Sequence, residues 1–173
     1  MIERIISAVL LSGILFTTVS FAETKQPRNE PIQFEITTHL GDNQTFKQGD
    51  VISFMVSLDK DAYLSLIYQD ASGNLIQILP NELASNNFYE AGLFLAVPNR
   101  EQAFRLTVSP PFGRETLWGF ASSAPLPTLT GESLHNGFVI IGKDMAEVLK
   151  TLRPKQTGIQ YGEAKTTLTT IAD

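Results

Sequence analysis

The alternation of apolar and polar residues at positions 51–58 is the feature that most limits how this chain folds. Every second side chain in this segment is apolar, and serines at positions 53 and 57 lie on the opposite face. The apolar residues are Ile52, Phe54, Val56 and Leu58. A period of two residues is typical of a β-strand that buries one face. Residues 103–109 repeat the pattern with Phe104, Leu106 and Val108, so the sequence predicts a β-rich fold.

Short polar turns connect the segments that we expect to be strands. The predicted strands are residues 32–40, 51–58, 63–69, 75–79, 92–97, 103–109, 115–121, 138–141 and 162–171. Consecutive strands joined by such short connections favour antiparallel pairing. We therefore expect the strands at 51–58, 63–69 and 75–79 to form a meander, with residues 82–91 and 122–131 as loops.

One helix is predicted, at residues 144–153. Its apolar stripe consists of Met145, Val148, Leu149 and Leu152, which recur at helical spacing. Asp144 is the expected N-cap, and Glu147 follows three residues later, as in a capping box. Pro154 ends the helix because proline has no backbone N–H to continue it. We expect the stripe to cover the end or the open face of a sheet.

The composition favours a single domain that depends on its hydrophobic core. The chain has 173 residues and no cysteine, so no disulfide contributes to its stability. From these patterns we expect residues 32–173 to form one mainly β domain. The predicted fold is an antiparallel β-sandwich-like domain with one short helix in its C-terminal half.

The first 22 residues have the pattern of a secretory signal peptide. Residues 5–19 carry no charge, and Ser20-Phe21-Ala22 provides the small residues of a cleavage site. The run is short for a membrane span, which needs about 20 apolar residues. We expect cleavage after Ala22, a flexible leader at 23–31 and no stable membrane insertion afterwards, with an uncleaved anchor as the alternative. The protein is then periplasmic or secreted, in a bacterial cell envelope.

The sequence offers little for the common catalytic chemistries. His39 and His135 stand in different segments without a partner at metal-ligand spacing, so we expect no metal site. Ser133 lies two residues before His135, but no nucleophile-elbow pattern surrounds it. No phosphate-binding glycine loop occurs, and we expect no cofactor. The net charge of −5 and the lack of a basic block argue against nucleic-acid binding.

Several polar and aromatic residues remain as candidates. Asp59 and Asp61 flank a turn and offer two carboxylates, but aspartate is favoured in turns for its own backbone bonding. The aromatic residues Tyr63, Tyr68, Trp118 and Phe120 fall in predicted strands, where packing is the usual role. Phe112 and Arg114 instead lie in a turn after Pro110-Pro111. We predict that these two residues contribute to a binding surface, because aromatic and arginine side chains are over-represented at interface hot spots. The alternative is that Phe112 folds inward and that Arg114 pairs with Glu115 or caps the loop.

An ordered set of short motifs spans residues 46–121. The motifs are Phe46-Lys47-Gln48-Gly49-Asp50, Ala62-Tyr63-Leu64, Gly73, Leu79-Pro80-Asn81, Gly92, Val97-Pro98 and Pro111-Phe112-Gly113-Arg114-Glu115. In order and spacing this segment resembles the bacterial family known as domain of unknown function 4384. The resemblance implies a β-rich accessory module, often attached to caspase-like peptidases, protein kinases or envelope proteins. No catalytic residues are established for the family, so none is transferred.

These observations favour a non-catalytic binding or protein-interaction module of the cell envelope over an enzyme. The expected partner is another envelope protein. Two alternatives stay open: a hydrolase whose site is assembled from distant residues, and a structural subunit of a secretion or surface apparatus.

Overall fold

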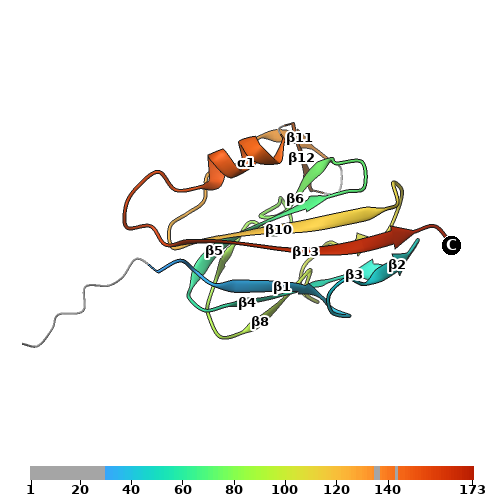
Figure 1. The fold of residues 1–173 in the computed structure, drawn as a ribbon, viewed down its shortest axis with the longest axis horizontal. Coiled ribbons are helices and arrows are strands. Elements are labelled where there is room, and N and C mark those ends of the chain that lie inside the picture. The colour runs from blue at the N-terminus through green and yellow to red at the C-terminus, as the bar shows by residue number, and fades with distance from the viewer. Residues whose placement is uncertain (1–29, 135–136, 143) are drawn as a thin grey trace, which may run out of the picture.

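The computed structural model describes residues 30–134, 137–142 and 144–173, which form three layers (Figure 1). A large β-sheet lies in the middle, a small sheet packs on one of its faces, and a single helix, α1, covers part of the other face. The two packed sheets confirm the predicted β-sandwich-like fold with one short helix. The predicted signal peptide and most of the predicted leader lie outside the described residues.

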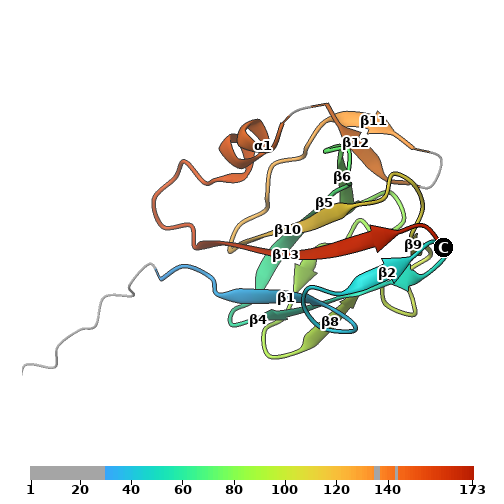
Figure 2. The same ribbon diagram turned by 45° about the vertical axis from the view of Figure 1, so that its right-hand side comes forward.

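The large sheet is almost entirely antiparallel. Its strands follow the order β11, β12, β6, β5, β10, β13 and β2. In addition, β7 pairs with the first two residues of β5. Their bounds are β2 Thr45–Lys47, β5 Ala62–Gln69, β6 Leu75–Leu79, β7 Phe88–Tyr89, β10 Arg114–Ser122, β11 Gly131–Ser133, β12 Val139–Ile141 and β13 Tyr161–Ile171. The one parallel pair joins β13 to β2 at the edge of the sheet. The long strand β13 therefore has neighbours on both sides (Figure 2).

The small sheet has three antiparallel strands in the order β1, β4 and β8. Their bounds are β1 Phe34–Thr38, β4 Phe54–Leu58 and β8 Phe94–Val97. A separate two-stranded ribbon pairs β3, Val51–Ile52, with β9, Leu106–Thr107. The backbone of Ile32, just before β1, bonds to Tyr161 at the start of β13, with 3.3 Å between Ile32 N and Tyr161 O. This bond ties the two sheets together along one edge.

Alternating side chains fill the main core between the two sheets. The apolar residues predicted at 51–58 are all buried there, from Ile52 to Leu58, and they meet Leu64, Leu66 and Leu117 of the large sheet. Gly119 of β10 also faces this core. A Cβ atom on Gly119 would lie 2.3 Å from Ile36 Cδ1 of β1, so a larger residue there would require the side chains of Ile36 and Phe34 to move.

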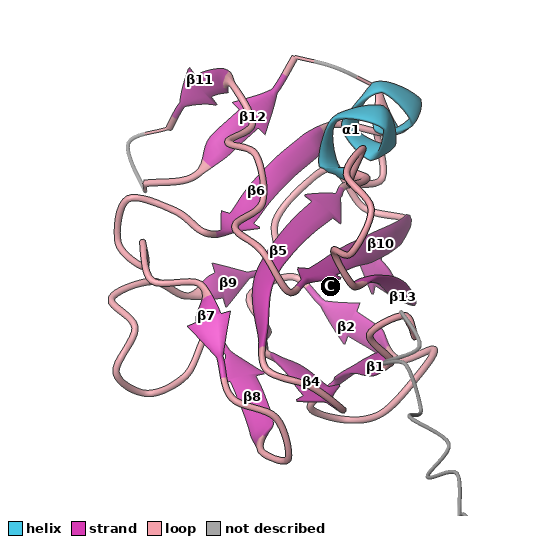
Figure 3. Cartoon of the chain, turned by 90° about the vertical axis from the view of Figure 1, so that its left-hand side faces the viewer, coloured by secondary structure: helices cyan, strands magenta, loops and turns pink. Residues whose placement is uncertain are grey.

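A second core lies on the outer face of the large sheet, where α1 covers it (Figure 3). It contains Ile67, Leu75, Phe120, Leu129, Ile141, Val148 and Leu152. Because β5 and β10 contribute to both cores, they are buried on both faces. The apolar stripe of the helix therefore covers the open face of a sheet, as predicted.

The helix α1, Met145–Leu152, begins and ends within one residue of its predicted bounds. The Asp144 carboxylate caps it by accepting the Glu147 backbone N–H at 2.9 Å. At the other end Arg153 leaves the helical conformation, and its side chain forms a bidentate ion pair with Glu163 of β13. Val148 and Leu152 are fully buried, whereas Met145 and Leu149 are only half-buried at the margin.

The predicted three-strand meander is wrong. The turn at residues 59–61 does not form a hairpin but carries the chain from the small sheet to the large one, because β4 pairs with β1 and β8 while β5 pairs with β6 and β10. Only the hairpin of β5 and β6 remains. The sequence pattern missed this because the apolar pattern of a strand shows which of its faces are buried, but not which strand it pairs with.

Short strands account for the other differences. Residues 103–109 alternate as predicted, with Phe104 and Val108 buried, yet only β9 pairs in a ladder. The predicted strand at 51–58 is divided into β3 and β4 at Ser53. Three further strands, β2, β7 and β11, have only two or three residues each and lie outside the predicted strands. Such short strands carry too few residues to show a period of two.

Candidate functional site

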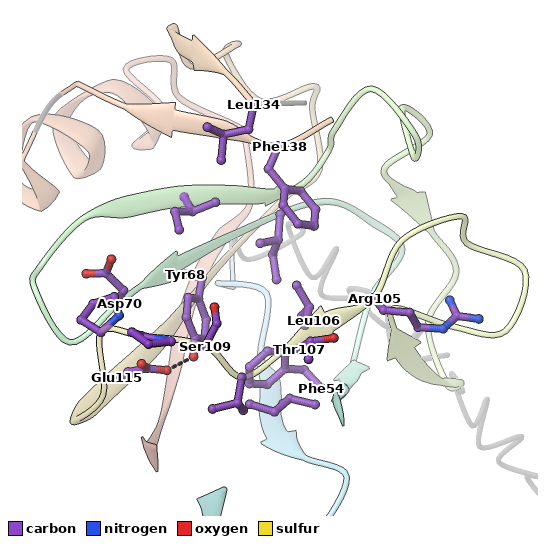
Figure 4. A pocket seen from close by; sticks show the side chains of 16 residues that line it. Phe54, Tyr68, Asp70, Arg105, Leu106, Thr107, Ser109, Glu115, Leu134 and Phe138 are labelled. Atoms are coloured by element: carbon purple, nitrogen blue, oxygen red, sulfur yellow. Dashed lines mark hydrogen bonds between the residues drawn. The ribbon is translucent and has the colours of Figure 1, made fainter. Parts of the chain in front are cut away.

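A cleft opens between the two sheets beneath residues 105–111, which we call the strap (Figure 4). The cavity has a volume of about 210 Å³. Its lining comes from β3, β4, β5, β6, the strap, the start of β10 and the segment around β12. The lining residues are Ile52, Phe54, Tyr68, Asp70, Ile76, Ile78, Arg105, Leu106, Thr107, Val108, Ser109, Pro110, Pro111, Glu115, Leu134 and Phe138. Most of the wall is apolar.

Backbone bonds to the ribbon strand β3 hold the strap in place. Leu106 and Thr107 pair with Ile52 and Val51 in β9 and β3. The Val108 N–H donates to Asp50 O at 2.9 Å, and Val108 O accepts the Gly49 N–H at 3.0 Å. Pro110 and Pro111 then end the ladder because proline has no backbone N–H. The cleft is therefore roofed by a segment with a fixed backbone.

Three polar side chains from three different strands meet at the floor of the cleft. Glu115 of β10 is 4% exposed and points inward in the same register as Leu117. Its Oε1 accepts the Thr170 hydroxyl of β13 at 2.9 Å, and its Oε2 accepts the phenol of Tyr68 of β5. Thr170 Oγ1 in turn accepts the Gly113 N–H at 3.1 Å. The carboxylate is thus oriented by two neutral donors, one on each oxygen.

Glu115 is a buried acid without a cationic partner among the described residues. The ion pair found among the described residues is the one between Arg153 and Glu163, and neither of these residues lines the cleft. Burial raises the pKa of the Glu115 carboxyl above its ordinary value, and the hydrogen bond from Thr170 opposes part of that rise. The floor therefore holds a group whose negative charge the surrounding protein does not neutralise.

The two other charged residues of the lining are engaged elsewhere. Asp70 closes the turn between β5 and β6, where its carboxylate accepts the N–H groups of Ser72 and Asn74, each at 2.9 Å. Arg105 donates from Nη1 to the carbonyl oxygens of Gln102 and Phe104. Figure 4 shows its guanidinium directed away from Tyr68 and Glu115.

The predicted binding residues Phe112 and Arg114 lie beside the cleft and do not line it. Phe112 is half-buried and packs against the main core, so much of its ring is part of the fold. Arg114 is exposed, and its side chain has no hydrogen-bond or ion-pair partner in the described part of the chain. Their prolines, Pro110 and Pro111, do line the cleft. A binding role for the two residues stays a prediction.

The strand aromatics pack as expected from the sequence. Phe120 is fully buried in the second core, and Trp118 packs at its margin with Nε1 donating to Gln69 Oε1 at 3.2 Å. Tyr63 contacts Phe88 of β7 at 5.0 Å between ring centroids. Tyr68 differs from these three because its hydroxyl belongs to the cleft floor.

The remaining candidates have structural partners. Asp59 Oδ1 accepts the Gln33 N–H and Asp61 Oδ1 accepts the Ala91 N–H, each at 2.8 Å, so both carboxylates fix backbone at the crossing between the sheets. His39 is exposed and contacts Ser53 through Nδ1 at 3.3 Å. His135 lies outside the described residues. Within 30–134, 137–142 and 144–173, no three metal-ligating side chains lie grouped together.

One feature of the sequence indicates the buried acid at the floor of the cleft, but it was not used in the sequence-based prediction. In β10 the inward positions are Glu115, Leu117, Gly119 and Ala121, so a charged residue occurs where the pattern requires an apolar one. Charged residues are almost never fully buried without a partner. An inward glutamate therefore signals a special site, but its partners Tyr68 and Thr170 are 47 and 55 residues away.

The described residues form a β-sandwich domain that contains a small cleft with a buried acid at its floor. Residues 45–125 match the family model described as Domain of unknown function (DUF4384), which confirms the resemblance that the motifs of this segment predicted. Comparisons with curated proteins and with solved structures found no match. The matched segment runs from β2 through β10, whereas Thr170, which orients Glu115, lies beyond it. Over the described residues, α1 is too short to cross a membrane.

Proposed function

We propose that this protein is a non-catalytic binding module of the bacterial cell envelope, periplasmic or secreted, that holds a partner protein through the cleft beneath the strap. The cleft itself carries the proposal. Its wall is apolar, its roof has a fixed backbone, and its floor presents one oriented carboxylate. Ligand sites commonly combine an apolar lining with a few convergent polar groups.

The size of the cleft favours part of a larger molecule as the occupant. Pockets for whole small ligands usually measure about 300–1,000 Å³, and this cavity measures about 210 Å³. A single side chain inserted from a partner protein suits that volume. A rigid roof supports such insertion, because little conformational entropy is lost when the partner binds.

The groups around the cleft support binding more than hydrolysis. A serine or threonine nucleophile needs a base within hydrogen-bond reach. Thr107 and Ser109 line the cleft, but no histidine or lysine is among its described lining residues. Glu115, the nearest candidate base, is occupied by Tyr68 and Thr170.

The test is a comparison of two tryptophan variants in a pull-down from native envelope, with bound proteins identified by mass spectrometry. Leu106→Trp places a large ring in the cleft, because Leu106 is half-buried in its lining. Leu40→Trp is the matched control, since Leu40 is 59% exposed and lies outside the cleft. We expect a protein captured by the wild type and by Leu40→Trp to be lost with Leu106→Trp. Equal capture by all three forms contradicts the proposal.

A further inference from the structure

The uncompensated carboxylate at the floor of the cleft indicates what kind of side chain enters it. Building on the proposed function, we propose that the cleft receives a lysine side chain of the partner protein, with its ammonium group at Glu115 and its alkyl stem along the apolar wall. The observations behind this are the burial of Glu115, its two neutral donors and the apolar lining above it.

Charge complementarity is the first argument. Buried ions in proteins are normally paired, because an unpaired charge is costly to remove from water. Among the described residues Glu115 accepts only from a phenol and a hydroxyl, and the guanidinium of Arg105 is directed elsewhere. A cation arriving from outside supplies the missing charge. The free acceptor capacity is there too, since a carboxylate has about four lone-pair sites and Tyr68 and Thr170 use two.

The shape of the cleft is the second argument. The apolar side chains of Ile76, Ile78 and Leu106 line the same cavity as Glu115, and so does the ring of Phe54. A lysine side chain buries its alkyl stem along such apolar surface while its ammonium reaches a polar group. A volume of about 210 Å³ corresponds to roughly seven water molecules at about 30 Å³ each, which suits one long unbranched side chain.

The arrangement of the hydrogen bonds favours lysine over arginine. A guanidinium binds a carboxylate best through two parallel N–H···O bonds, one to each oxygen. Tyr68 and Thr170 already occupy one site on each oxygen of Glu115. An ammonium is a compact point charge with freely rotating donors, so it needs only one open lone pair.

The experiment titrates capped amino acids into the mature chain and follows backbone amide chemical shifts by NMR. The probes are Nα-acetyl-lysine methylamide, the corresponding capped norleucine as a neutral analogue, the capped arginine, and free pentylamine. We expect the capped lysine to shift the amides of Tyr68, Leu106 and Glu115 in a saturable manner. The norleucine and arginine probes should bind at least about tenfold more weakly, which corresponds to about 1.4 kcal/mol.

Three variants separate charge from structure. Glu115→Gln keeps an acceptor for the Thr170 hydroxyl but removes the charge, and it should weaken lysine binding by at least about tenfold. Glu132→Gln is the matched control, because Glu132 is exposed on β11. Tyr68→Phe removes a donor and leaves the charge, so lysine binding should persist. Unchanged melting temperatures in Glu132→Gln and an intact amide spectrum in the other two establish that each variant folds.

Several results overturn the inference. Equal binding of norleucine or arginine, or undiminished lysine binding by Glu115→Gln, shows that the charge does not select the occupant. A loss in Tyr68→Phe as large as in Glu115→Gln assigns the effect to the hydrogen-bond network. If pentylamine binds more tightly than capped lysine, the occupant of the cleft is a free amine and not the side chain of a partner protein. If capped lysine shifts no amide of the cleft but Leu106→Trp still loses the partner in the pull-down, this inference fails and the proposed function stands. If Leu106→Trp captures as much partner as the wild type, the proposed function itself is rejected.

Discussion

Shortening Leu152 to alanine should destabilise the domain far more than the same change at Leu149. The two leucines lie one turn apart on α1, so both substitutions alter helix propensity equally. Leu152 is 1% exposed within the second core, whereas Leu149 is half-buried at its margin. Any difference between the variants therefore reports burial against the outer face of the large sheet.

The magnitudes follow from the packing. Leucine-to-alanine changes in closed cores cost about 3–5 kcal/mol, because the lost transfer free energy is joined by the cost of a cavity. At Leu149 the alanine leaves an open notch that water fills, so about 1 kcal/mol is expected from the lost apolar area. For a domain of this size 1 kcal/mol shifts the melting temperature by about 2–4 °C. Leu152→Ala should thus lower Tm by roughly 6–20 °C and Leu149→Ala by roughly 2–4 °C.

Thermal melts followed by circular dichroism measure both values, and urea unfolding checks that the m-value is unchanged. An unchanged m-value shows that the substitution changes stability without altering the surface exposed on unfolding. Equal shifts for the two leucines, or a loss below about 1 kcal/mol for Leu152→Ala, refute the conclusion that α1 docks through Val148 and Leu152.

Three further predictions concern the cleft, the neighbouring turn and export. Because burial raises the pKa of Glu115 in the folded state, the contribution of Glu115 to stability should fall as the pH rises from the unfolded-state value of about 4.3 through the folded-state value. Glu115→Gln should therefore match the wild type at low pH and gain in relative Tm toward neutrality. A Tm difference independent of pH contradicts this, since Asp70 and Arg105 are common to both forms. The double variant Phe112→Ala, Arg114→Ala should recover less partner in the pull-down. Unchanged recovery with a several-degree loss of Tm would show that the turn is only structural. Intact mass of the exported protein should match a chain that begins at Glu23, and retention of Met1 in the membrane fraction would disprove cleavage.

Local signals in the sequence predicted the elements that are long enough to show a period. The strand β10 and the helix α1 were predicted within a residue at each end, because alternation in one and an i, i+3, i+4 stripe with a cap in the other are properties of neighbouring residues. The assignment of strands to sheets was not predictable in the same way. Whether β4 pairs with β5 depends on distant partners, and the turn at 59–61 is compatible with both outcomes.

The cleft depends even more on long-range contacts. Glu115 is visible in the sequence as a charged residue at an inward position, but the residues that surround it in the cleft come from β5, β13 and the strap. Phe112 and Arg114 were predicted as binding residues because a turn with two prolines is a pattern of neighbouring residues. The structure places the cavity next to that turn, on the side where only the prolines contribute.

The position of β13 determines when the domain is able to fold. This strand is the last one described, yet it lies between β10 and β2 and supplies Thr170 to the cleft. Until residue 171 is available, β10 and β2 keep unpaired edges and the Tyr161 bond that ties the sheets is missing. A chain growing from its N-terminus therefore cannot complete the large sheet, or the bond that ties the two sheets, until β13 has been made.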